Sequence, residues 1–138
     1  MNTPIMLALV TLVCGGIITF FSQVAGVRQA YGPSYILFQC VGFAVVAIVI
    51  HLVQRHPVDL SPKMTGVAIL GGVVGAIGVS SLLLAFRMGG EGSIIFPIAG
   101  LSMIVSVPLS IVLFHEPVTA TKLLGLGLGI SSIIVLSR

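Results

Sequence analysis

The sequence predicts an all-α membrane protein with five transmembrane helices. Of its 138 residues, 57% are apolar and only 7% are charged, whereas soluble domains carry about 25% charged residues. The mean hydropathy of +1.26 likewise indicates that most of the chain is solvated by lipid. The apolar residues form continuous runs rather than the alternating pattern of a barrel strand, which favours helices.

Five apolar runs are separated by short polar segments, and crossing the hydrocarbon layer takes about 20 residues of helix. The first run is expected to be retained as a helix, because residues 1–4 lack the basic residues of a signal peptide. No segment between the runs is long enough for a soluble domain, so residues 1–138 are predicted to form a single transmembrane domain. The predicted helices cover residues 4–25, 35–53, 64–86, 92–114 and 120–136, the last being the shortest.

Small residues recur at intervals of four along two of the predicted helices. Small residues at this spacing let helix backbones approach closely in a bilayer. The pattern therefore predicts close helix packing, within the chain or across a dimer. The residues are Ala68, Gly72, Ala76 and Ser80 in the third helix, and Gly125 and Gly129 in the fifth.

The predicted fourth helix contains Pro97 and Pro108. Each proline removes a backbone hydrogen bond and clashes with the preceding turn, so we expect kinks at both positions. Broken helices are common in transporters, although other membrane proteins also contain them.

Several function classes are excluded by the distribution of charge. The six basic residues are scattered, which argues against nucleic-acid binding, and no ionisable residue lies near the centre of a predicted span. The three histidines lie on different segments, and Cys14 and Cys40 form no CxxC pair, so no metal site is predicted. We expect no enzymatic activity and no cofactor.

The polar groups available at membrane depth are uncharged. Tyr35 and Gln39 share a face near the start of the second helix, and the Gln39 amide needs a hydrogen-bond partner there. Ser102 and Ser106 lie four apart in the fourth helix, where bonding to their own backbone is an equally good explanation. We predict that these four residues contact a substrate and that Phe96 supplies an apolar wall.

Residues 85–125 carry a pattern that resembles the drug/metabolite transporter superfamily, in particular its EamA-type unit. The pattern is a glycine turn, a Pro-Ile helix with a second proline, a Phe-x-Glu end, and a following threonine and glycine. In this sequence the matching residues are Gly89, Pro97-Ile98, Val107-Pro108, Phe114-His115-Glu116, Thr119 and Gly125.

The resemblance implies one half of an inverted-repeat transporter, because most such transporters look like two fused units. Five helices per unit is an odd number, so two fused units lie inverted relative to each other. Two separate copies of this chain could form the same inverted repeat only by inserting in opposite orientations. The superfamily's four-helix multidrug exporters carry a buried glutamate in the first helix. Here no acidic residue precedes Asp59, so that coupling mechanism is not carried over.

These observations predict a secondary transporter of a small metabolite or amphiphilic solute, working as an antiparallel homodimer. With five spans, Arg28, Arg87 and Arg138 face one side, and Arg55, Lys63 and Lys122 face the other. Because basic residues set orientation, this equal count favours neither orientation. The expected location is the bacterial or archaeal cell (inner) membrane, and the expected partners are a small-molecule substrate, the lipid bilayer and a second copy. A non-transporting scaffold or regulatory subunit and a lipid-carrier flippase remain open as alternatives.

Overall fold

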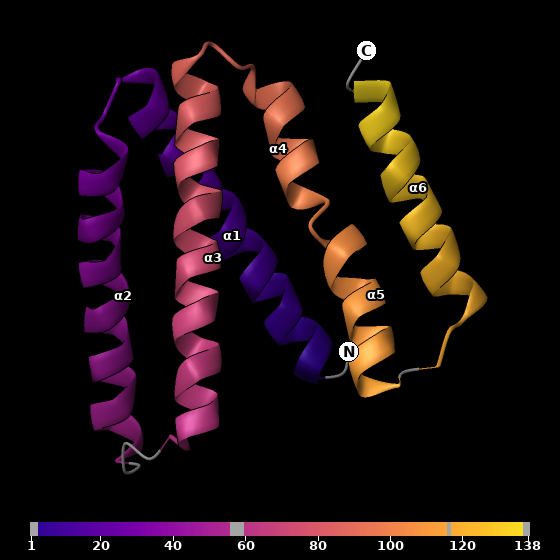
Figure 1. Ribbon diagram of the computed structural model, residues 1–138, viewed down its shortest axis with the longest axis horizontal. Coiled ribbons are helices and arrows are strands. Elements are labelled where there is room, and N and C mark those ends of the chain that lie inside the picture. The colour runs from indigo at the N-terminus through magenta and orange to yellow at the C-terminus, as the bar shows by residue number, and fades with distance from the viewer. Residues whose placement is uncertain (1–2, 56–59, 116, 137–138) are drawn as a thin grey trace. The chain divides into compact units, whose positions relative to one another are not determined.

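The computed structural model describes residues 3–55, 60–115 and 117–136, and their regular secondary structure is entirely helical (Figure 1). The predicted fold class, an all-α membrane protein, is confirmed. Three residues that the sequence analysis uses lie outside the described residues: Asp59, Glu116 and Arg138. The helices are α1 (Thr3–Val27), α2 (Gly32–Gln54), α3 (Pro62–Arg87), α4 (Gly92–Gly100), α5 (Met103–Phe114) and α6 (Ala120–Leu136).

Four of the apolar stretches are long enough to cross a bilayer: α1, α2, α3 and the stretch that comprises α4 and α5. The fifth predicted segment corresponds to α6, which has 17 residues and is apolar apart from Thr121, Lys122, Ser131 and Ser132. The chain divides into two compact units, Met1–Gly89 and Gly90–Arg138.

In the first unit, α3 packs against both α1 and α2. Figure 1 shows α1 running obliquely to α3. The tightest contact is at Gly26, where a methyl group added to the α-carbon would lie 2.6 Å from Cβ of Phe86 and 3.0 Å from the Leu83 carbonyl oxygen. Around this crossing, the side chains of Ser22, Leu83 and Phe86 are only 1–2% exposed. The absence of a side chain at Gly26 therefore lets α1 and α3 approach to backbone contact.

The turns that follow α1 and α3 have the same backbone form. Each reverses at a residue in the left-handed region, Gln29 with φ 58° and Gly89 with φ 87°. In both turns this residue donates its N–H to the carbonyl three residues earlier, at Gly26 and Phe86. A side chain is unfavourable in this conformation, but glycine carries none.

The Gln29 side chain also connects the two turns. Its Nε2 donates to the Arg87 carbonyl oxygen at 3.2 Å, and its Oε1 accepts from Nε of Arg87 at 3.1 Å. The carboxyl ends of α1 and α3 are thereby joined across 58 residues of sequence. Arg87 and the α1–α2 turn that contains Arg28 therefore lie at the same end of the first unit, as the topology inferred from the sequence requires.

In the second unit, the predicted fourth helix is divided in two. The interruption lies at Leu101 and Ser102, between the two prolines, whereas Pro108 lies inside α5. Neither proline has an N–H to donate, so the carbonyls four residues before them lose a helical partner. Across the interruption, Leu101 N–H donates to the carbonyls of both Pro97 and Ile98, and Ile104 N–H donates to the Leu101 carbonyl. The bonds to Ile98 and Leu101 span three residues instead of four, which is typical of a tightened turn.

Helix α6 packs against α4 and α5, and Gly129 meets the interruption between them and the first turn of α5. A methyl group at Gly129 would lie 3.2–3.4 Å from the side-chain ends of Leu101, Met103 and Ile104. No such neighbour lies within 4 Å of the corresponding position at Gly125. Of the two glycines that the sequence predicts to pack in this helix, Gly129 therefore contacts its own unit.

Candidate functional site

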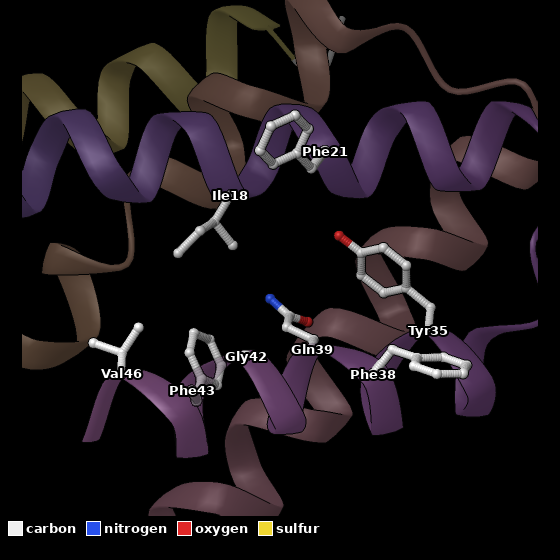
Figure 2. Close-up of a pocket in the computed structure, with 8 residues that line it drawn as sticks. All are labelled: Ile18, Phe21, Tyr35, Phe38, Gln39, Gly42, Phe43 and Val46. Carbon is white, nitrogen blue, oxygen red and sulfur yellow. The ribbon is translucent and has the colours of Figure 1, made fainter. Parts of the chain in front are cut away.

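An open cavity of about 500 Å³ lies between α1 and α2 in the first unit. Ile18 and Phe21 line it from α1, and α2 supplies the remaining residues (Figure 2). Figure 2 shows the Tyr35 hydroxyl and the Gln39 amide pointing into the space between the two helices. The α2 residues are Tyr35, Phe38, Gln39, Gly42, Phe43 and Val46.

A second cavity of about 370 Å³ adjoins the first on the side of α3. Ile18, Gln39 and Phe43 line both cavities, so the two spaces meet at these side chains. Gly71, Gly72 and Gly75 form much of the α3 wall, and a methyl group at any of them would have no neighbour within 4 Å. The glycine-rich face of α3 therefore borders open space in this unit, whereas the sequence predicts close packing for the stripe that includes Gly72.

Tyr35 and Gln39 lie four residues apart on α2, a spacing that places them on one helical face. Gln39 is seven residues from the start of the 23-residue helix α2. At 1.5 Å per residue, this is about 10 Å along a helix of roughly 35 Å. The amide is thus inside the span and closer to the end that adjoins the α1–α2 turn.

The chemistry of these two cavities is that of neutral hydrogen bonding within hydrocarbon walls. The Gln39 amide offers both donors and an acceptor, and the Tyr35 phenol offers one of each. None of the residues lining either cavity is Asp, Glu, Lys, Arg or His. The arrangement can bind and orient a solute, but it provides no acid–base pair among these lining residues.

The other predicted contacts lie in the second unit. The Ser106 hydroxyl donates to the Ser102 carbonyl oxygen at 3.3 Å. This is the bond to its own backbone that the sequence analysis gives as the alternative to a substrate contact. Ser102 lies at the interruption between α4 and α5 and makes no side-chain capping bond to α5. Phe96 is half-buried within α4, next to Pro97. The structure thus brings Tyr35 and Gln39 together at one cavity, and Ser102 and Ser106 together at the helix interruption.

Sequence reasoning missed most of the cavity walls. Ile18, Phe21 and Phe43 are ordinary apolar residues in apolar runs, and nothing in their identity distinguishes them from residues that face lipid. A helical-wheel comparison could have found Phe43, which lies one turn after Gln39. The α1 residues face the cavity because of the oblique direction in which α1 crosses α3 (Figure 1), which periodicity alone does not reveal.

Comparison with known proteins identifies the family to which this chain is similar. The model of the EamA-like transporter family matches residues 2–138. An uncharacterized protein of Methanocaldococcus jannaschii is 30% identical over 142 residues, covering 99% of this chain and 98% of the relative. No solved structure matches the chain.

Proposed function

Because the chain belongs to the EamA-like transporter family, we propose that it is a secondary transporter of a small metabolite or amphiphilic solute that works as an antiparallel homodimer. The observation that carries this proposal is the cavity between α1 and α2, where Tyr35 and Gln39 direct neutral polar groups into an apolar space within the span. Solute sites in membrane transporters are built inside the helix bundle from a few polar groups on apolar walls. We propose the bacterial or archaeal cell (inner) membrane as its location.

Two uncovered surfaces support a dimer. The glycine-rich face of α3 has no neighbour within 4 Å of the methyl positions at Gly71, Gly72 and Gly75. In the other unit, an open groove runs along one face of α6, lined by residues from Ala120 to Ser131. Small residues are enriched where membrane helices meet, so a second copy is a suitable partner for the α6 groove, and at the α3 glycines it would enclose the cavity without filling it. This second copy would also help to close the open cavity.

The charge count supports the antiparallel arrangement. Three basic residues face each side of the membrane in a five-span topology, and orientation follows the excess of Lys and Arg in short loops. A chain without such an excess can insert both ways, and two oppositely inserted copies together make an inverted repeat. The cavity then has equivalents that face both sides of the membrane.

We expect comparable signals from two reporters fused separately to the C-terminus, one active only in the cytoplasm and one active only outside. Adding two lysines at one terminus should bias insertion and lower solute flux, and co-expressing an oppositely biased copy should restore it. A signal from one reporter alone would contradict the antiparallel dimer and would favour a parallel dimer or a different partner.

A further inference from the structure

The two cavities of the first unit restrict which solutes can bind. Their shared residues are Ile18, Gln39 and Phe43, so a solute in either space contacts the Gln39 amide or lies beside it. Apart from Gln39, the polar side-chain atoms on the walls are the Tyr35 hydroxyl and the Cys40 thiol. A solute that enters the cavities therefore exchanges water for carbon, with one amide and one phenol as its main hydrogen-bonding partners.

The absence of charged groups among the lining residues disfavours binding of an ionic solute. Moving an ion out of water costs several kcal/mol unless an opposite charge compensates it, and the lining residues include no carboxylate, ammonium, guanidinium or imidazole. The aromatic rings could attract a cation, but cation–π contacts contribute only about 0.5–2 kcal/mol. The desolvation penalty is the larger effect, so a neutral solute is favoured.

The walls also favour a ring over a flexible chain. Four of the eight residues that line the larger cavity are aromatic: Phe21, Tyr35, Phe38 and Phe43. Aromatic pairs gain about 0.5–1.5 kcal/mol beyond the area that they bury. A lipid acyl chain would gain from apolar contact, but it would leave the Gln39 amide without a hydrogen-bonding partner.

We propose that the Tyr35–Gln39 cavity selects uncharged solutes that carry an aromatic ring and one neutral hydrogen-bonding group, such as a primary amide. This inference rests on the proposed transport function, because it names the class of solute that the transporter takes. Gln39 is the group that distinguishes such a solute from a purely apolar one.

Binding of four nearly isosteric probes to the purified full-length chain in nanodiscs tests this selection. The probes are phenylpropanamide, phenylpropanoate, phenylpropylammonium and butylbenzene, which are respectively neutral and polar, anionic, cationic, and apolar. We expect the amide to bind the wild type at least about tenfold more tightly than either ion. In Gln39→Leu, amide binding should weaken by about five- to tenfold, the range of one hydrogen bond, while butylbenzene binding stays within twofold. Binding to protein-free nanodiscs is subtracted for each probe, so that lipid partitioning does not enter the comparison between probes or between the two proteins.

The alternative outcomes overturn different statements. An ion that binds as tightly as the amide would overturn the selection for neutral solutes, although the cavity would still be a binding site. Equal binding of butylbenzene and the amide to the wild type would assign the cavity to apolar chains such as lipid. If no probe distinguished the wild type from Gln39→Leu, the cavity would not be the site. Transport itself is judged separately, by the release of solutes from vesicles that contain no probe.

Discussion

Replacing Gly26 with alanine is expected to destabilise the protein by about 2 kcal/mol or more, because the added methyl group would lie 2.6 Å from Cβ of Phe86 and 3.0 Å from the Leu83 carbonyl. Neither neighbour is the flexible end of a side chain, so α1 and α3 must move apart. The move would open the contact around Ser22 and Leu83, which are among the few fully buried side chains in the described part of the chain. Reversible unfolding in mixed micelles, followed by circular dichroism, measures this effect.

The matched control is Gly16→Ala, the same substitution on the same helix. A methyl group at Gly16 has no neighbour within 4 Å, and alanine is favoured over glycine in a helix by about 1 kcal/mol. Gly16→Ala should therefore leave stability unchanged or raise it slightly. Equal stability of the two variants would mean that α1 and α3 do not cross at Gly26.

Replacing Gly75 with leucine should weaken solute binding with little loss of stability. Gly75 lines the smaller cavity, and a side chain there meets no atom within 4 Å at its first carbon. The isobutyl group would therefore extend into the space beside Gln39 that the solute occupies. We expect affinity for phenylpropanamide to fall by at least about tenfold, a loss of about 1.4 kcal/mol. Equilibrium binding of this probe to the purified chain measures the effect.

Gly78→Leu is the control for this experiment. Gly78 lies on the same helix, has the same open surroundings, and is not among the residues that line either cavity. The two variants carry the same gain in helix propensity. If both lost binding equally, the effect would come from α3 in general and not from the cavity, and the placement of the site would be wrong.

The helices follow from the sequence because a helix satisfies its own backbone hydrogen bonds within the bilayer. A long apolar run is thus sufficient evidence for each span, and the structure has helices in all five predicted segments. The interruption of the fourth span was harder to place. Prolines at positions 97 and 108 indicate a weakened helix, but the break lies between them, at Leu101 and Ser102. The position of the break depends on which carbonyls accept from the remaining backbone N–H groups, such as that of Leu101, which donates to both Pro97 and Ile98.

The packing could be predicted less well, because glycine has two opposite uses in a membrane helix. Gly26 lies at the tight crossing of α1 and α3, where it follows the small residue Ser22 at the packing interval of four. Gly72 belongs to a stripe and instead lines a cavity. Which use applies depends on the neighbouring helix, and that neighbour is distant in sequence. Tyr35 and Gln39 could be recognised because their polarity is conspicuous in an apolar run, whereas the apolar walls around them could not.

Release of solutes from sealed vesicles tests most directly whether this chain transports small molecules. Liposomes that contain only the purified chain are loaded with a small-molecule cell extract and diluted, and the retained compounds are measured by mass spectrometry. Protein-free liposomes and liposomes with Gln39→Ala or Ser106→Ala serve as references, with equal protein amounts confirmed for each variant. We expect the wild type to release a defined set of small solutes that protein-free liposomes retain, and Gln39→Ala to retain most of that set. Identical retention by wild-type and protein-free liposomes would contradict transport by this chain, and unchanged release by both variants would contradict the placement of its site.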